Sequence, residues 1–234
     1  MVIPKLFQVV GDNLGVHSLL GYVTSFTANY YCRYCKGHRS DLQKLVAEDQ
    51  SLLRNKENYS GDIISNDASL TGVKTTSALN QIDGYHVVEN VAPDVMHVFT
   101  EGIIPLEMHL VLQRLIEREM FTLEEVNLRI ISFNYGFVDR INKPTPIRLS
   151  SLLNSSAASG QTSAQMTCLA LNHFLMLGDR IKQNSEEWEV FLLLIEIFKI
   201  GMSQCISLSA TYYPKVLIKD HHELFPFEFF HIVP

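Results

Sequence analysis

The chain has 234 residues, of which 47% are hydrophobic and 19% charged, so its apolar content suffices for one large domain or two small ones. Nineteen Lys and Arg residues stand against 25 Asp and Glu residues, which gives a formal net charge of -6. Proteins that bind nucleic acid by themselves usually carry a basic excess, because phosphate neutralisation supplies most of their non-specific affinity. The charge therefore argues mildly against DNA binding by this chain alone. It leaves open a catalytic domain that holds DNA through metal ions or a separate basic domain.

The N-terminus lacks the basic start, apolar stretch and cleavage site of a signal peptide. The most apolar run, residues 190–200, is interrupted by Glu196 and Lys199 and is too short to cross a bilayer. These features predict an intracellular protein without a membrane segment. The four cysteines do not form a disulfide framework pattern, and we expect Cys168 and Cys205 to be buried as small apolar side chains.

The first half of the chain offers few regular elements. An apolar run over residues 6–10 ends at Gly11-Asp12 and predicts a buried strand that delivers a carboxylate at its end. Residues 14–31 suggest a short helix that runs into a loop. Ser40 is a candidate cap for a helix over residues 40–55, and the polar residues 56–80 are typical of a long loop.

From Asp94 onward the pattern is largely helical. Two capping boxes and one further cap predict helices that follow Thr122, Thr162 and Ser185, with the last running to about residue 207. Residues 142–161, with two prolines and many serines, indicate a surface loop or linker. The sequence thus predicts a mainly α chain with a small β remnant at its start.

The segment from Cys32 to His38 contains a Cys-x2-Cys spacing, which places two thiolates within reach of one tetrahedral ion. Cys32 and Cys35 are therefore candidate zinc ligands, with His38 as a third and His86 or His97 as the source of a fourth. A redox pair and a pair of inert thiols are the alternatives, although a redox pair of the thioredoxin sort would have an alternating βαβ context that is missing here.

Three groups with metal-binding capacity follow Pro93. If the chain is α-helical from Asp94, then Asp94, His97 and Glu101 fall at i, i+3 and i+7 on one face. The alternative interpretation makes Asp94 only a helix cap and Glu101 a solvated carboxylate. Asp12 is a further candidate acid, although Gly-Asp-Asn is also ordinary turn chemistry. For the His221-His222 pair, in an aromatic setting, we favour a structural role.

The order of these blocks resembles the transposase of CACTA (En/Spm-like) elements, especially the animal-type versions. The resemblance spans roughly residues 8–225 and rests on Gly11-Asp12-Asn13-Leu14-Gly15, on Ala28-Asn29-Tyr30-Tyr31-Cys32-Arg33-Tyr34-Cys35, and on Asp94-Val95-Met96-His97 with Glu101-Gly102. The last two blocks in this order are moderately specific.

The resemblance implies a truncated RNase H-like fold carrying a helical insertion, with acids that hold Mg²⁺ or Mn²⁺ for two-metal phosphoryl transfer. Asp12 would be the second acid and Glu101 the third, with Asp94 as the alternative third acid. The cysteines would belong to a structural zinc knuckle in the insertion, linked by His97. The implied partner is transposon-end DNA, with self-association into a homo-oligomer and a nuclear location as further expectations.

The family's first acid lies upstream of anything in this chain, so we expect a partial cut-and-paste transposase that is inactive alone. The expected layout is a partial catalytic region over residues 1–141, the linker or loop 142–161, and a helical region over 162–234. The alternative function is a non-catalytic, zinc-stabilised helical module that binds protein or DNA.

Overall fold

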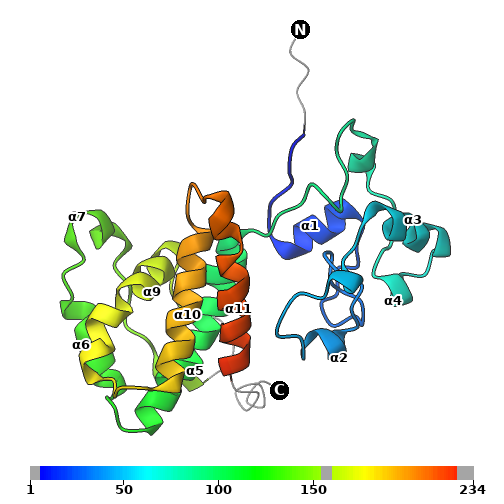
Figure 1. The fold of residues 1–234 in the computed structure, drawn as a ribbon. Coiled ribbons are helices and arrows are strands. Elements are labelled where there is room, and N and C mark those ends of the chain that lie inside the picture. Colours follow the sequence, from blue (N-terminus) through cyan, green and yellow to red (C-terminus); the bar gives the residue numbers. More distant parts are fainter. Residues whose placement is uncertain (1–5, 154–159, 226–234) are drawn as a thin grey trace. The chain divides into compact units, whose positions relative to one another are not determined.

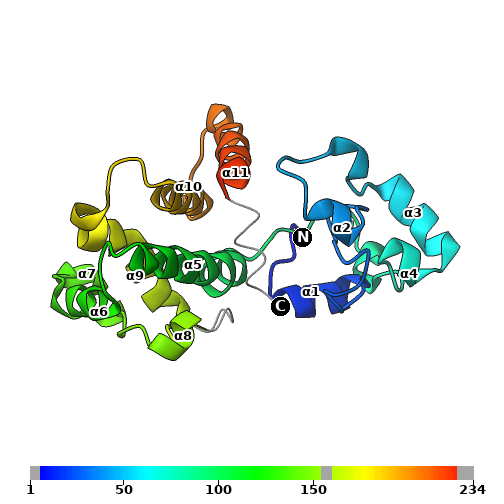
Figure 2. The same ribbon diagram turned by 90° about the horizontal axis from the view of Figure 1, so that it is seen from below.

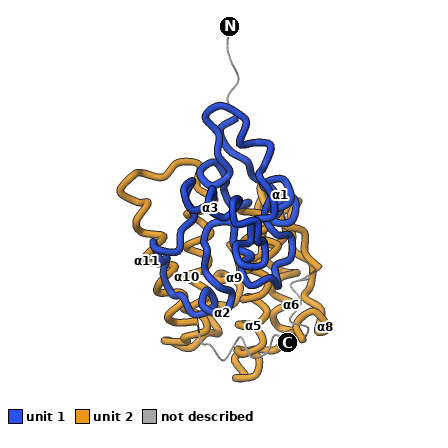
Figure 3. Tube along the Cα trace, turned by 90° about the vertical axis from the view of Figure 1, so that its right-hand side faces the viewer, with its two compact units in different colours: residues 1–94 blue, residues 95–234 orange. Residues whose placement is uncertain are grey.

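A computed structural model describes residues 6–153 and 160–225, and it divides the chain into two compact units. Unit 1 covers Met1–Asp94 and unit 2 covers Val95–Pro234 (Figure 3). The described residues are mainly helical, which confirms the predicted class, and their only β pairing consists of three isolated bridges. The loop or linker predicted over residues 142–161 includes the short helix α8 (Leu149–Leu153), and its residues 154–159 lie outside the described part of the chain.

Unit 1 is a set of short helices joined by turns around a small core. Its elements are α1 (Asn13–Leu20), α2 (Arg39–Leu42), η1 (Gln50–Leu52), α3 (Lys56–Ser65), α4 (Ala68–Thr71) and η2 (Ala78–Gln81), as Figure 1 shows. The core gathers side chains from both ends of the unit: Val16, Leu20, Tyr22, Tyr59, Val73, Tyr85, Val87 and Val91. Because these residues span most of the unit, the long turns between helices are held by shared burial rather than by a sheet.

The strand predicted over residues 6–10 is wrong. Only Val9 makes a bridge there, a parallel one with Val91. Phe7 is 82% exposed and Val10 56% exposed, so the apolar run does not enter a core. A buried strand needs neighbouring strands that pair along its length. In the described residues, this segment pairs at Val9 alone.

The long helix predicted over residues 40–55 is also wrong, as is the loop over 56–80. The helical turn α2 ends at Leu42, and the chain resumes helical structure only at η1. The region predicted as a loop contains α3, α4 and η2. Asn55 and Asn58 form a reciprocal capping box at the start of α3, and Tyr59 and Asp62 supply its buried face. Tertiary burial and this cap outweigh the polar composition of the segment.

Unit 2 is a bundle of longer helices. Its elements are η3 (Met96–Ile103, a π-helix), α5 (Ile104–Glu117), α6 (Leu123–Ser132), α7 (Gly136–Asp139), η4 (Arg140–Asn142), α8 (Leu149–Leu153), α9 (Ser163–Leu177), η5 (Gly178–Arg180), α10 (Glu186–Gly201), η6 (Leu208–Thr211) and α11 (Tyr213–Leu224). In Figures 1 and 2, α10 lies beside α5 and α11. The main core of the bundle is formed by α5, α6, α9 and α10, with Ile104, Leu115, Ala170 and Phe198 fully buried.

The predicted capping boxes of unit 2 are confirmed. Thr122 accepts a hydrogen bond from the backbone N–H of Glu125 at the start of α6, and Thr162 does the same with Gln165 at the start of α9. The helix predicted after Ser185 is α10, which ends at Gly201 rather than near residue 207. No helix in the described part of the chain is both long and apolar enough to cross a membrane.

Candidate functional site

The bridge between Val9 and Val91 joins two distant segments of unit 1 in parallel. The backbone N–H of Val9 donates to the carbonyl of Asn90 at 2.9 Å, and the N–H of Ala92 donates to the carbonyl of Val9 at 3.2 Å. The Asn90 amide also donates to the carbonyl of Phe7 at 2.9 Å. Because the pairing is parallel, both segments leave it in the same direction.

Asp12 lies three residues after Val9, and its carboxylate is held in place at the start of α1. The side chain accepts the backbone N–H of Gly15 at 2.8 Å, which is an N-cap contact. A Cβ on Gly15 would approach the other carboxylate oxygen of Asp12 to 2.6 Å, so glycine leaves room for this orientation. Asp12 remains exposed, and its carboxylate is accessible.

Asp94 lies three residues after Val91, in the position along its segment that Asp12 has along the other. It is half-buried and precedes the helical residues. The α-helix expected from Asp94 is not formed, because the helix that follows is the π-helix η3. The i, i+3, i+7 face predicted for Asp94, His97 and Glu101 therefore does not exist as such. What unit 1 provides instead is Asp12 and Asp94 at corresponding positions after a parallel bridge.

His97 and Glu101 lie together on η3 in unit 2. The His97 Nε2 is 3.7 Å from a Glu101 carboxylate oxygen, with the side chains 31% and 47% exposed. A Cβ on Gly102 would approach the carbonyl of His97 to 2.8 Å, which is tighter than real Cβ contacts. Glycine therefore suits this wide helical turn. Short π-helical stretches are rare and often occur at functional sites.

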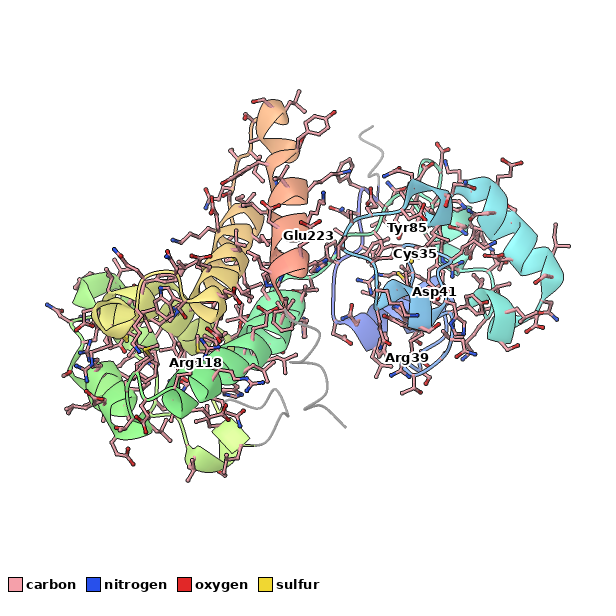
Figure 4. The ribbon with its side chains drawn as sticks, turned by 60° about the horizontal axis from the view of Figure 1, so that its bottom comes forward. Cys35, Arg39, Asp41, Tyr85, Arg118 and Glu223 are labelled. Atoms are coloured by element: carbon pink, nitrogen blue, oxygen red, sulfur yellow. The ribbon has the colours of Figure 1, made fainter. Side chains whose placement is uncertain are left out.

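Cys32 and Cys35 are brought together in a loop of unit 1, where Figure 4 labels Cys35. The backbone N–H of Tyr34 donates to the Cys32 Sγ at 3.4 Å. The neighbouring Cys35 thiol is the main cause that lowers the pKa of Cys32 to about 6, and the neighbouring Cys32 together with burial raises the pKa of Cys35. The loop thus favours one thiolate beside one thiol.

His38 has local contacts through its Nδ1 and its ring. Its Nδ1 lies 2.8 Å from the hydroxyl of Ser40 and caps α2, and its ring packs edge-on against Tyr30 with centroids 5.4 Å apart. His97 belongs to unit 2. Within the described ranges, no three His, Cys, Asp or Glu side chains form a group that could hold a metal ion. Of the four predicted zinc ligands, the structure therefore brings together only the two cysteines.

Two arginines organise the cysteine loop, and the sequence did not single them out. Arg33, only 4% exposed, donates to the side-chain oxygen of Asn13 at 2.8 Å and so links the cysteine loop to the Gly-Asp-Asn block. Arg54 donates to the carbonyl of Cys32 at 3.1 Å, to Asp62 at 2.9 Å and to the carbonyl of Thr71 at 2.6 Å. The position of Arg33 between the cysteines was a signal, whereas nothing in the sequence marks Arg54.

The remaining predicted residues have structural surroundings. His221 Nε2 lies 2.9 Å from a Glu107 carboxylate oxygen, with both side chains 4% exposed, in agreement with the structural role expected for it. Cys168 is buried as predicted. The prediction for Cys205 is wrong, since this residue follows the end of α10 in an exposed turn.

No protein family, curated protein or solved structure matches the chain.

Proposed function

We propose that this chain is a partial cut-and-paste DNA transposase of the CACTA type, built on part of an RNase H-like core. The observation that carries the proposal is the parallel Val9–Val91 pairing, with Asp12 and Asp94 each three residues beyond it. The pairing is a single isolated bridge rather than a sheet, but its parallel sense directs both acid-bearing segments the same way. The motif order supports the same assignment, because these acids lie in two of the blocks that carry the resemblance.

Carboxylates are the ligand type for the divalent ion that the family implies. Mg²⁺ is usually held by one or two carboxylates together with water and substrate phosphates, and Mn²⁺ accepts the same oxygen ligands. Asp12 and Asp94 would hold the ion, and the N–H of Gly15 fixes the carboxylate of Asp12. When bound, such an ion activates an attacking hydroxyl and stabilises the leaving oxygen of a phosphodiester. Glu101, the third acid that the resemblance favours over Asp94, lies beside His97 in unit 2.

The chain's acidity gives the ion a second role. With a net charge of -6, the protein repels phosphate at long range, so a bound divalent ion would be the local positive charge that DNA requires. The proposed partner is transposon-end DNA.

A second candidate function is a non-catalytic, zinc-stabilised interaction module. The observation that favours it is the cysteine loop, in which the backbone N–H of Tyr34 donates to the sulfur of Cys32. Such donors stabilise a thiolate, which is the form that binds zinc. Cys32 and Cys35 would supply two ligands, which is half of a closed tetrahedral set. The described residues offer no third ligand at this point.

The test of the first proposal is Mn²⁺ binding to the purified full chain, followed by the electron paramagnetic resonance of free Mn²⁺. We expect the Asp12→Asn and Asp94→Asn substitutions each to raise the Kd about tenfold, which corresponds to about 1.4 kcal/mol. Asp67→Asn is the matched control, because Asp67 is also an N-cap of unit 1 and accepts the N–H groups of Ser69 and Leu70. Asparagine caps helices as well as aspartate, so the Asp12 and Asp67 variants should keep their helix caps, and circular dichroism checks that the Asp94 variant folds.

The outcomes separate the candidate sites. A loss of Mn²⁺ affinity in Asp12→Asn and Asp94→Asn, but not in Asp67→Asn, supports the edge of the parallel pair as the metal site. A loss only in Glu101→Gln moves the site to η3 and contradicts the assignment of Asp94. Equal affinity in every variant contradicts the proposal. Zinc content of wild type and Cys32→Ser, measured by metal analysis, tests the second candidate independently of Mn²⁺.

A further inference from the structure

A groove of about 500 Å³ lies between α10 and α11 in unit 2. The two helices lie side by side in Figures 1 and 2, and Figure 4 labels Glu223 near the end of α11. The groove is lined by acidic and leucine side chains only: Glu189, Leu192, Leu193, Glu196, Asp220, Glu223 and Leu224. Its volume falls within the range typical of binding sites, about 300–1,000 Å³.

The helical spacing places these side chains on the two facing sides. On α10, Glu189, Leu192, Leu193 and Glu196 follow i, i+3, i+4, i+7, which is one face of an α-helix. Leu192 is 39% exposed, and Leu224, on α11, is 40% exposed. The leucines therefore present apolar surface to the groove that the packing of unit 2 leaves in contact with water.

The four carboxylates give the groove a strongly negative potential. The Tyr213 hydroxyl donates to Glu196 at 2.7 Å, and Lys219 lies 3.5 Å from a Glu223 carboxylate oxygen. That ion pair is exposed, with both side chains about half accessible, and such pairs neutralise little of the field. None of the lining residues that the structure describes is basic. Carboxylates around a shared groove repel one another, and a cationic partner would relieve that repulsion.

We propose that this groove binds a basic amphipathic helix of a partner protein. The chemistry selects this occupant from three others. A metal ion would satisfy carboxylates but leave the leucines exposed, and nucleic acid would bring phosphates to an acidic surface. The same groove on a second copy of the chain carries the same charges, so groove-to-groove self-association is disfavoured. A helix with leucine-like side chains at i, i+3, i+4, i+7, flanked by Lys or Arg, matches both features.

The probe for the test is a fluorescein-labelled peptide of about four helical turns. It contains only leucine and lysine, placed so that the leucines share one helical face. Binding to the full chain is followed by fluorescence anisotropy, and added salt should weaken it. A scrambled peptide of the same composition has the same charge without the apolar face, and it should bind about tenfold more weakly.

The variant that tests the groove is Glu189→Gln combined with Glu223→Gln. We expect it to weaken binding of the amphipathic peptide about tenfold and to reduce the salt dependence. The matched control removes the same charge elsewhere in unit 2, through Glu119→Gln and Glu124→Gln, both exposed. Leu192→Ser should weaken binding without changing its salt dependence.

Four results would overturn the proposal. The first is the absence of peptide binding to the wild-type chain, and the second is equal binding of the scrambled peptide. The third is an equal loss of binding in the Glu119/Glu124 control, which would indicate a net-charge effect. The fourth is a wild-type dimer in light scattering that the groove variant dissociates, which would make a second copy of the chain the occupant. None of these depends on the metal or DNA chemistry proposed for unit 1.

Discussion

Arg54 is a buried cation with several partners in unit 1, and its removal allows a quantitative test. Its side chain is fully buried, donates to Asp62 and to two backbone carbonyls, and lies 5.3 Å from the centre of the Tyr22 ring. Breaking a buried ion pair by removing one partner typically costs about 3–5 kcal/mol, because the other charge remains buried. Asp62 keeps a second partner, Lys36 at 2.8 Å, so we expect the Arg54→Met substitution to cost about 3 kcal/mol.

That loss is large compared with the stability of a unit of this size. Unit 1 spans Met1–Asp94, for which ordinary stability per residue gives about 5–14 kcal/mol in all. With a urea slope of about 1–3 kcal/mol per molar, the unfolding midpoint of Arg54→Met should fall by about 1–3 M. The signal can be assigned to one unit, because the only tryptophan, Trp188, lies in unit 2. Far-UV circular dichroism should shift while the tryptophan fluorescence transition stays in place.

The control is Lys56→Met in the same unit. Lys56 pairs with Glu89 at 2.8 Å, but both side chains are 56% exposed, and exposed pairs contribute about 0–1 kcal/mol. A double variant with Asp62→Asn should recover part of the loss, since it removes the charge that Arg54→Met leaves buried. Equal effects of Arg54→Met and Lys56→Met would refute the assignment of Arg54 as the centre of unit 1. A matching shift in tryptophan fluorescence would refute independent unfolding.

Three further predictions concern single residues. Burial lowers the pKa of His173 to about 4 from its ordinary value of 6.5, so the unfolded chain binds more protons between these pH values. Stability should be complete above pH 6.5 and fall by about 3 kcal/mol as the pH drops toward 4, and His173→Phe should remove that slope in urea titrations. Gly84→Ala should lower the free energy of unfolding by about 1–2 kcal/mol, because the φ of this residue is positive. Gly72→Ala should lower it clearly more, because its Cβ would also lie 1.9 Å from the carbonyl oxygen of Tyr30. Thermal melts of the two variants compare these losses. Thr122→Ala should cost about 1 kcal/mol through loss of the α6 cap, with Thr122→Ser retaining most of it.

Local signals predicted the helix starts of unit 2 well, because caps are local. Thr122 and Thr162 each form the reciprocal contact that their spacing indicates, and the apolar periodicity that follows is buried in one bundle. The same reasoning missed α3, whose cap uses Asn55 with Asn58 in place of the usual glutamate or glutamine. Its helical state depends on burying Tyr59 and Asp62 against distant parts of unit 1, which composition does not reveal.

For the candidate site, the sequence predicted which residues to consider but not which of them lie near one another in the fold. Asp12, Cys32 and Cys35 were identified from their motifs, but the partner segment of Asp12 became visible only through a bridge between Val9 and Val91. The hydrogen bond between Glu107 and His221 joins residues 114 positions apart. Pairings at such separation depend on the packing of whole helices and leave no local pattern in the sequence. The π-helical form of η3 likewise requires the tertiary setting, since its residues also fit an ordinary α-helix.

Arg33 links two of the blocks that the sequence analysis singled out. Its guanidinium joins Asn13, directly after Asp12, to the loop that holds both cysteines, and Arg54 donates to the carbonyl of Cys32 in the same loop. A change in the ligation or oxidation of the cysteines would therefore alter the position of Arg33 and, through Asn13, the start of α1. The carboxylate of Asp12 caps that same start. On this basis the cysteine loop supports the start of α1 as well as the fold of unit 1, so we expect loss of the Arg33–Asn13 hydrogen bond to weaken the cap that Asp12 forms.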